Sequence, residues 1–310
     1  MFPLDDLLKE RGVLVLDGGL ATELERQGHD LDHDLWSARF LLEDPDSIAA
    51  VHRAYLEAGA DVITTAAYQA SIPGLMEIGL NARQARTAYM DALRIARGVC
   101  DEFSAQKRFV AASIGPYGAF LADGAEYRGH YAASDAQIEA FHRPRIALLA
   151  EATERGEGPD LLAIETIPSV PEARLILRIL KNYPKLCAWL SFTCSGTETC
   201  EGQPIESCAE LCEDVPQILA VGVNCSSPLD MPELLARLLA ASSKPLVCYP
   251  NSGESYEAQS RSWSGASVFT KSEDEPREWL RRGVKLIGGC CRTTPKDIAQ
   301  LVRLRKTLRD

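Results

Sequence analysis

Three cysteines in the C-terminal part of the chain have a pattern that could bind a metal. Cys225 directly follows the apolar run Ile218 to Asn224, and Cys290 and Cys291 lie just after the run Val284 to Ile287. Sulfur ligands suit a soft or borderline cation, and three protein ligands leave one tetrahedral position open, which is typical of catalytic zinc. The pattern therefore predicts one Zn²⁺ ion held by all three cysteines.

The adjacency of Cys290 and Cys291 restricts how they can share an ion. Neighbouring residues in a regular strand point to opposite faces, so the backbone must leave β geometry here, and Gly288 and Gly289 are expected to permit this. The alternatives are that all three cysteines are small buried thiols, or that Cys290 and Cys291 are a redox pair. Four other cysteines are expected in the core, namely Cys187, Cys208, Cys212 and Cys248, whereas no role is assigned to Cys194 and Cys200.

The kind of ligand narrows the chemistry. Three thiolates around Zn²⁺ make a net negative site and a poorer Lewis acid than a histidine site, so hydrolysis is disfavoured. A substrate thiol is a better fourth ligand, and it would bind as thiolate at neutral pH, where a free thiol with a pKa of about 8.5 is mostly protonated. We therefore predict alkylation of a substrate sulfur, with no catalytic group beyond the zinc-activated substrate thiolate.

Two carboxylates, Asp17 and Glu165, also end apolar runs and are expected at the same edge as the cysteines. Such a pair can hold an ammonium group, while backbone N–H groups around Gly18 can bind a carboxylate. An amino acid with a thiol would satisfy both, so we predict a substrate site made of Asp17, Gly18, Glu165, Thr65 and Asn251. The alternative is a turn-forming Asp-Gly pair and a surface acid near a helix.

The elements that must position these residues form a regular alternation. Apolar runs with strand character are separated by segments with helical spacing, which indicates a parallel sheet. The eight runs are Val13 to Asp17, Asp61 to Tyr68, Phe109 to Ser113, Leu161 to Glu165, Leu186 to Thr193, Ile218 to Asn224, Pro245 to Tyr249 and Val284 to Ile287. The helical segments are Asp46 to Glu57, Ala82 to Val99, Asp135 to Glu154, Pro171 to Lys181, Pro232 to Ala240, Asp274 to Arg282 and Pro295 to Leu308.

A doubly wound sheet is the rival fold. Strand and helix units nevertheless fill the whole chain without a linker or a shift in composition, so we predict a single (β/α)8 TIM-type barrel domain over residues 1–310. Two connections, Gly115 to Ser134 and Asn251 to Ser272, are unusually long and follow strand ends, where they could act as lids. His52 and His142 lie in helical segments and are expected to be satisfied structural histidines rather than ligands.

Charge and composition exclude several functions. Thirty-three basic and 44 acidic residues give a net charge of −11, which opposes binding to nucleic acid. The start of the chain, Met1 to Glu10, has no apolar run of the length of a signal peptide core, and nothing later approaches the 18 uninterrupted apolar residues of a membrane span, so no membrane partner is expected. Ten scattered cysteines do not resemble the framework of a small secreted domain, and reduced thiols in a cytoplasmic protein are expected instead.

At these residues the sequence resembles the zinc-dependent homocysteine S-methyltransferase family. The motifs that carry the resemblance are Leu16-Asp17-Gly18-Gly19-Leu20-Ala21-Thr22-Glu23-Leu24, Gly222-Val223-Asn224-Cys225 and Gly288-Gly289-Cys290-Cys291-Arg292-Thr293-Thr294-Pro295. The resemblance implies a barrel, homocysteine as methyl acceptor and methionine as product. It also implies zinc at Cys225, Cys290 and Cys291, with homocysteine held near Asp17 and Glu165.

Further motifs resemble the branch of that family that uses S-methylmethionine. They are Ser113-Ile114-Gly115-Pro116-Tyr117-Gly118-Ala119, Glu126-Tyr127-Arg128-Gly129, Phe141-His142-Arg143-Pro144-Arg145 and Tyr249-Pro250-Asn251-Ser252-Gly253-Glu254. A methylsulfonium donor needs aromatic faces and carboxylates around it, which Tyr117, Glu126, Tyr127 and Trp263 of the two long connections could supply. No Gly-x-Gly-x-x-Gly motif follows the first strand and no Gly-Lys-Ser/Thr phosphate loop occurs, so nothing favours a nucleotide cofactor.

Several alternatives remain open from the sequence. S-Adenosylmethionine is a second sulfonium donor, and a betaine-dependent methyltransferase or a zinc lyase would use a similar barrel. A noncatalytic protein that stores zinc or senses thiols belongs to a different class. The fourth zinc ligand of the resting protein could be Tyr68, Gln69, Asn251 or water.

Overall fold

The strands close into a parallel barrel. The computed structural model describes residues 2–31, 39–257, 262–264 and 273–308, without the side chains of 255–257 and 262–264. Eight parallel strands are hydrogen-bonded in the order β1-β12-β9-β8-β5-β4-β3-β2, and a bridge between Leu16 and Val62 joins the two ends. The strands are β1 (Leu14–Val15), β2 (Val62–Thr64), β3 (Phe109–Ile114), β4 (Leu161–Ile167), β5 (Ala188–Phe192), β8 (Ile218–Asn224), β9 (Leu246–Tyr249) and β12 (Val284–Ile287). The predicted (β/α)8 fold is confirmed.

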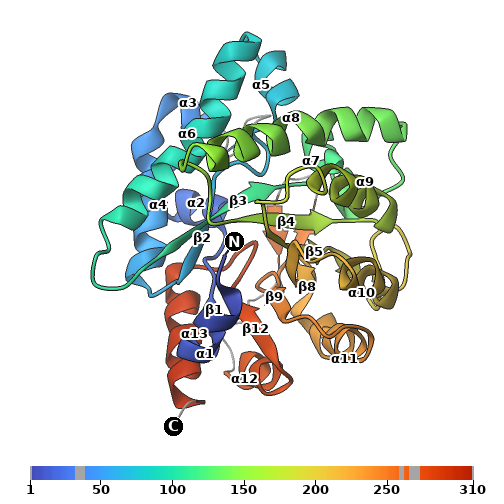
Figure 1. Cartoon of the computed structure of the whole chain (residues 1–310). Helices are drawn as coiled ribbons and strands as arrows, with labels where there is room; N and C mark the ends of the chain where they lie inside the picture. Colours follow the sequence, from blue (N-terminus) through green and yellow to red (C-terminus); the bar gives the residue numbers. More distant parts are fainter. Residues whose placement is uncertain (1, 32–38, 258–261, 265–272, 309–310) are drawn as a thin grey trace.

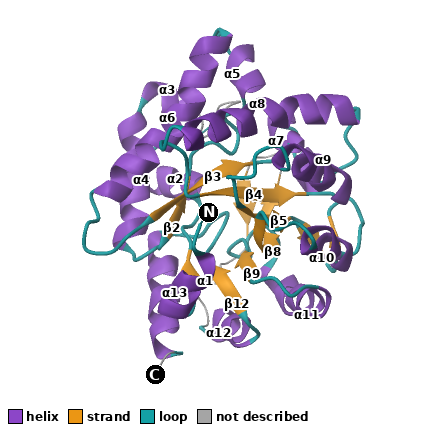
Figure 2. Cartoon of the chain, in the orientation of Figure 1, coloured by secondary structure: helices purple, strands orange, loops and turns teal. Residues whose placement is uncertain are grey.

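Helices surround the strands, as Figure 2 shows. The main crossover helices are α4 (Pro45–Glu57), α6 (Ala82–Asp101), α8 (Asp135–Glu154), α9 (Val170–Leu180), α10 (Ile205–Glu213), α11 (Met231–Ala241), α12 (Asp274–Arg281) and α13 (Pro295–Thr307). Capping boxes start three of them, with Asn81 and Gln84 before α6, Ser134 and Gln137 before α8, and Thr294 and Asp297 before α13. All seven predicted helical segments are confirmed within one or two residues at each end.

Shorter elements decorate the strand ends. They are α2 (Leu20–Arg26), α3 (Phe40–Glu43), α5 (Ile72–Glu77), α7 (Tyr117–Leu121), η2 (Ala125–Tyr127) and η3 (Pro228–Asp230), with the hairpins β6 (Cys194–Ser195) with β7 (Glu198–Thr199) and β10 (Ser255–Glu257) with β11 (Ser262–Ser264). The connection Gly115 to Ser134 thus contains two short helical turns. The second long connection, Asn251 to Ser272, lies partly outside the described residues. Its predicted role as a lid therefore stays a prediction.

The core has two layers, one inside the barrel and one between the strands and the helices. The inner layer includes Leu14, Phe109, Trp189 and Leu286, and the amphipathic helix α1 (Leu4–Arg11) packs against it with Leu4 and Leu7. Helix α1 lies across the end of the barrel where the strands begin, near its centre in Figure 1. It excludes water from that end, so the open end is the one where the strands finish and where barrel enzymes place their sites.

One buried histidine differs from the sequence expectation. His52 in α4 is fully buried, and no described residue hydrogen-bonds either ring nitrogen, so the expectation of a satisfied histidine is wrong; burial lowers its pKa to about 4 and keeps it neutral.

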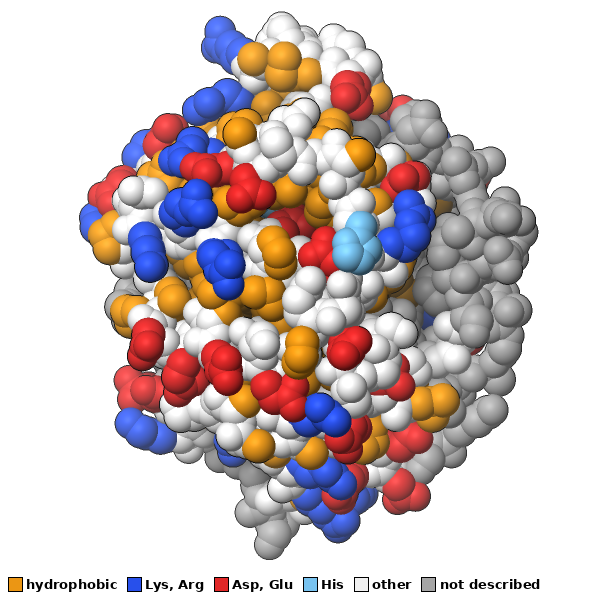
Figure 3. All heavy atoms as spheres, turned by 90° about the vertical axis from the view of Figure 1, so that its right-hand side faces the viewer, with side chains coloured by type: hydrophobic (Ala, Val, Ile, Leu, Met, Phe, Trp, Pro, Cys, Tyr) orange, Lys and Arg blue, Asp and Glu red, His pale blue; other side chains and the backbone are white. Residues whose placement is uncertain are grey.

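On the face drawn in Figure 3, acidic and basic side chains are interspersed. No helix in the described part of the chain is long and apolar enough to cross a membrane.

The contact between β8 and β9 gives a direct test of this architecture. A Cβ at Gly222 of β8 would lie 1.7 Å from the Val247 carbonyl oxygen of β9, so we expect Gly222→Ala to destabilise the protein by about 3 kcal/mol or more. Gly98→Ala is the matched control, because Gly98 lies inside α6 with nothing within 4 Å of the added atom. That change should stabilise by about 0.5–1 kcal/mol. Urea unfolding followed by circular dichroism measures both, and equal stability of the two variants would contradict the strand packing.

Candidate functional site

A pocket opens where the strands end. Its described lining combines the predicted cysteines and carboxylates with residues of α2, of the ends of β2, β3 and β4, and of η2. The lining residues are Asp17, Gly18, Gly19, Leu20, Ala21, Thr22, Glu25, Thr64, Thr65, Ala66, Tyr68, Gln69, Ser113, Glu126, Tyr127, Glu165, Thr166, Cys225, Tyr249, Gly289, Cys290 and Cys291. Segments far apart in the sequence therefore form one site, as the barrel requires.

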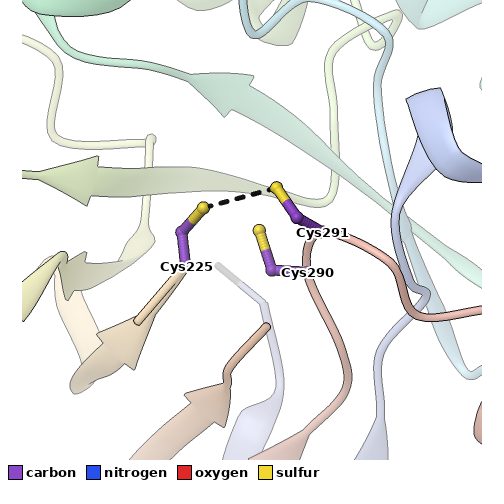
Figure 4. Close-up of side chains that lie close together, drawn as sticks. All are labelled: Cys225, Cys290 and Cys291. Carbon is purple, nitrogen blue, oxygen red and sulfur yellow. Dashed lines mark hydrogen bonds between the residues drawn. The ribbon is translucent and has the colours of Figure 1, made fainter. Parts of the chain in front are cut away.

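The three predicted cysteines converge in this pocket. Their sulfur atoms all lie within 4.8 Å of one another, and the Cys225 and Cys291 sulfurs are 3.6 Å apart. Figure 4 shows Cys225 at the end of its strand, opposite Cys290 and Cys291 on a neighbouring loop, with the three side chains turned toward one point. Three sulfur ligands at this spacing fit one soft or borderline cation and leave the side toward the pocket open.

The backbone reaches this arrangement in a way that the sequence prediction only partly describes. Strand β12 ends at Ile287, so the chain has left β geometry before Cys290, as expected. Neither Gly288 nor Gly289 has a positive φ, however, and the left-handed residues are Cys225, with a φ of 50°, and Arg292 after the cysteine pair, with a φ of 65°. The glycines are needed for close approach instead, because a Cβ at Gly288 would lie 2.7 Å from the Leu16 Cβ.

Hydrogen bonds to the end of β9 and the residues after it hold the cysteine backbone. The Cys225 N–H donates to the Tyr249 carbonyl at 3.2 Å, and the Cys290 N–H donates to the Pro250 carbonyl at 2.8 Å. The Cys291 N–H donates to Asn251 Oδ1 at 3.2 Å. The end of β9 and the two residues after it therefore hold the backbone of all three sulfur ligands. Hydrogen bonds from Cys225 and Cys290 lower the pKa of the Cys291 thiol.

Glu165 is aimed into the pocket by a bulge in β4. The next residue, Thr166, has a φ of 58°, and the register of β4 against β5 shifts between Ile164 and Ile167. Asn224 at the end of β8 holds this bulge: its Oδ1 accepts the Thr166 N–H at 2.7 Å and its Nδ2 donates to the Thr166 hydroxyl at 2.8 Å. Because bulges redirect side chains, Asn224 sets the direction of Glu165.

The Glu165 carboxylate has neutral partners only. It accepts from the Ser113 hydroxyl at 2.5 Å and from the Tyr249 hydroxyl at 3.1 Å, and Trp189 Nε1 in turn donates to Tyr249 at 2.8 Å. Burial raises the pKa of Glu165 to about 7, although both hydroxyl bonds favour the charged form. No salt bridge among the described residues neutralises it.

Asp17 is also a buried carboxylate with neutral hydrogen-bond partners. Its Oδ2 accepts the Thr64 N–H at 2.7 Å and the Thr64 hydroxyl at 3.0 Å. Burial raises the pKa of Asp17 to about 8, and the nearby charge of Glu165 adds to the rise. Two buried carboxylates without a cationic partner in the described structure offer a place for a cation carried by a ligand.

The loop after β3 brings a third carboxylate and a phenol to the pocket. Glu126 is 8% exposed, its Oε2 has no hydrogen-bond partner among the described residues, and burial raises its pKa to about 7. The Tyr127 hydroxyl lies 3.2 Å from the Cys225 sulfur. The sequence prediction grouped Tyr127 with the methyl donor and did not foresee this contact with a metal ligand.

The other predicted site residues are placed as follows. Gly18 and Thr65 line the pocket, and so do Tyr68 and Gln69, which were considered as fourth ligands. Asn251 is absent from the described lining, and its side chain accepts the Cys291 N–H instead. Tyr117 is absent from the lining too, because its ring packs against Phe120, Tyr131 and Phe141. The Trp263 side chain lies outside the described part of the structure.

Sequence reasoning missed the residues that orient the carboxylates, namely Thr64, Ser113, Asn224 and Tyr249. Each stands at or beside the end of a predicted strand, so its position was available from the sequence. Nothing in the sequence indicates the bulge at Thr166 that turns Glu165 inward.

The comparisons with known proteins agree with this site. The family model for homocysteine S-methyltransferase matches residues 14–304. The homocysteine S-methyltransferase YbgG of Bacillus subtilis is 42% identical, over 100% of this chain and 99% of its own length. That of Escherichia coli is 41% identical over 96% and 97%. The crystal structure of the metallated form of the Escherichia coli homocysteine methyltransferase MmuM has a TM-score of 0.85 at 39% identity, covering 96% of this chain and 98% of that one.

The fold and the site together define a barrel enzyme with a three-cysteine metal centre that acts on a thiol. The chain belongs to the homocysteine S-methyltransferase family. Its activity is the transfer of a methyl group to homocysteine, and Cys225, Cys290 and Cys291 are its zinc site. Buried structural thiols and a redox pair, the alternatives weighed above, are not needed to explain the triad.

The zinc site predicts a separation of metal binding from folding. Changing any one of the three cysteines to Ser should lower zinc content well below one ion per chain and abolish methyl transfer. Circular dichroism should be retained, because the barrel core does not depend on an ion at its rim. Cys200→Ser is the control, since Cys200 is partly exposed in another loop, and it should keep full zinc. Full zinc occupancy in all three site variants, measured by elemental analysis, would overturn the assignment.

Proposed function

We propose that the methyl donor is S-methylmethionine, so that the enzyme converts homocysteine and S-methylmethionine into methionine. The observation that supports this donor best is the Glu126 carboxylate, which is buried at the pocket with one oxygen unpartnered in the described structure. A buried carboxylate without a partner is costly, and a cationic sulfonium beside it would remove that cost. The donor sites we propose are Glu126 and Tyr127, with Tyr117 and Trp263 as further candidates on the two long connections.

We propose that the amino-acid part of homocysteine lies between the carboxylates and the start of α2. Asp17 and Glu165 would bind its ammonium group, and Thr65 would lie beside them. The N–H groups of Gly18 and Leu20 have no acceptor among the described residues, whereas those of Asp17 and Gly19 donate to Val62 and Thr293. The free N–H groups of Gly18 and Leu20 would therefore bind the substrate carboxylate. Asn251 would act on this site by holding Cys291.

The methyl-transfer step itself requires no general acid or base from the protein. When bound, zinc would stabilise the homocysteine sulfur as a thiolate nucleophile. The S–CH₃ bond to homocysteine forms as the S–CH₃ bond of the sulfonium breaks, and the leaving group departs as a neutral thioether. No proton moves, so no general base is required. Glu126, Asp17 and Glu165 would orient and neutralise the cationic parts of the two substrates.

We infer that the chain is one domain and that it works in the cytoplasm. One barrel accounts for all the described elements. None of the ten cysteines forms a disulfide, and seven of them are buried, which favours a reducing compartment.

The carboxylate pair predicts a pH dependence of head-group binding. Methionine tests this without a thiol, because it carries the same ammonium and carboxylate groups. The ionised carboxylates bind the ammonium group, and since the pKa values of Glu165 and Asp17 are raised to about 7 and about 8, both become protonated as the pH falls from 8 to 6. The methionine dissociation constant should therefore rise by roughly tenfold over this range, by linkage.

Glu165→Gln separates this effect from zinc loss. At pH 8 the variant should bind methionine roughly ten- to a hundredfold more weakly, because a charge-assisted hydrogen bond is worth about 1.5–3 kcal/mol. Its pH dependence should be shallower and its zinc content normal. Calorimetric titration with methionine measures the affinity and its pH dependence, and elemental analysis measures the zinc content. Binding by the wild type that does not change between pH 8 and 6, or a variant that cannot take up zinc, would contradict the proposed role.

A comparison of three methyl donors tests the proposed donor. S-Methylmethionine, S-adenosylmethionine and betaine would each be supplied with homocysteine to the zinc-loaded enzyme, and kcat/KM compared by methionine formation. We expect the highest kcat/KM for S-methylmethionine, because a larger sulfonium must also place an adenosyl group, and Glu126→Gln should lower the value for both sulfoniums by roughly tenfold. A higher kcat/KM for S-adenosylmethionine or betaine would reject the donor and leave the zinc site intact.

A further inference from the structure

A buried charged cluster outside the pocket has no role in the chemistry described so far. His142 and Arg145 of α8 and Glu172 at the start of α9 are each at most 1% exposed. The first two belong to the sequence motif Phe141 to Arg145 that resembles the family branch. A buried Glu and a buried Arg carry a large desolvation cost, so their partners should show what the cluster does.

The three side chains form one chain of hydrogen bonds. Arg145 Nη2 lies 2.8 Å from His142 Nδ1, and His142 Nε2 lies 2.7 Å from Glu172 Oε1. Since a guanidinium can only donate, Nδ1 accepts and Nε2 carries the proton, which it donates to Glu172. His142 is therefore neutral and links the positive Arg145 to the negative Glu172, in agreement with the lowered pKa that burial gives it. The prediction of a satisfied structural histidine is confirmed for His142.

The outer partners of the cluster all lie in one segment, residues 115–131, which we call the donor-side loop. Glu172 Oε1 accepts the Tyr117 N–H at 2.6 Å, and Glu172 Oε2 accepts the Tyr131 hydroxyl at 3.0 Å. Arg145 Nη2 donates to the Gly115 carbonyl at 3.1 Å. The cluster thus binds the beginning and the end of the donor-side loop at the same point.

The middle of the donor-side loop lies over the pocket. It carries Glu126, with its unpartnered oxygen, and Tyr127, whose hydroxyl lies 3.2 Å from the Cys225 sulfur. The two halves of the loop are in close contact, because a Cβ at Gly118 would lie 2.5 Å from the Glu126 nitrogen. Fixing Tyr117 and Tyr131 therefore also fixes the position of Glu126.

We propose that Glu172 is a positioning residue for methyl transfer, which clasps both ends of the donor-side loop so that Glu126 and Tyr127 face the donor. This inference rests on the proposed function in one respect, that the donor lies beneath this loop. Arg145 and His142 give the buried Glu172 carboxylate a hydrogen-bonded connection to a positive charge, and the carboxylate accepts the two loop bonds and the His142 bond together. Homocysteine and zinc, held on other elements, should be little affected by the clasp.

The test uses the full zinc-loaded enzyme and two variants. Tyr131→Phe removes one loop bond and leaves the buried charges in place, and Glu172→Gln removes the charge that accepts both. We expect the KM for the best of the three methyl donors to rise two- to tenfold in Tyr131→Phe and more in Glu172→Gln, since one or more hydrogen bonds are lost. The KM for homocysteine should change less than twofold. Hydrogen exchange should become faster in peptides covering residues 117–131.

The control is Tyr183→Phe, which makes the same chemical change in the turn after α9, away from the donor-side loop. It should leave both KM values and the exchange unchanged. If Tyr131→Phe has wild-type exchange and a wild-type donor KM, the clasp is refuted. Faster exchange with an unchanged donor KM, or an equal rise in both KM values, would also refute it. Failure of S-methylmethionine as donor would appear separately, in the wild type, and the clasp would still be tested with whichever donor is used.

Discussion

Three sulfur atoms from two distant parts of the chain have to lie within reach of one ion, and the closure of the barrel achieves this. Strands β8 and β12 both pair with β9, so the end of β8 and the chain after β12 lie on the two sides of one strand. The Tyr249 carbonyl at the end of β9 accepts a hydrogen bond from Cys225, while the Pro250 carbonyl and the Asn251 side chain accept from Cys290 and Cys291. Register errors at either strand pair would separate the ligands, which is why Gly222, packed against Val247 in the strand that leads to Cys225, matters to the site.

The second organising feature is a set of buried carboxylates that have no cation of their own. Asp17, Glu126 and Glu165 all have raised pKa values because burial disfavours their charged forms. The folded protein bears this cost in the empty pocket, and substrates that carry ammonium or sulfonium groups relieve it on binding. Affinity and charge selectivity for cationic substrates thus have the same physical origin, the desolvation of unpaired acids.

Backbone strain and buried networks surround these groups. Cys225 and Thr166 adopt left-handed conformations that are unusual for residues other than glycine, and each stands next to or supplies a functional side chain. Asn224, placed between them in space, bonds to the Thr166 backbone and precedes Cys225 in the chain. One side chain therefore connects the direction of Glu165 to the strand end that carries the metal ligand. Such conformations persist only where the surrounding hydrogen bonds determine them fully.

The sequence by itself determined the alternation of strands and helices, the barrel, the three cysteine ligands and the two acids at strand ends, because periodicity and strand-end residue types are local properties. It also placed Glu126 and Tyr127 on a long connection. Only the tertiary structure decided which partners those side chains have: the contact of Tyr127 with Cys225, the role of Asn251 behind Cys291, and the link from Arg145 through His142 to Glu172. Apart from the step between Arg145 and His142 within one helix, these contacts join residues between 30 and 98 positions apart, where no sequence period operates. The direction of a side chain at a bulge or a positive φ depends on neighbours that only the folded barrel brings together.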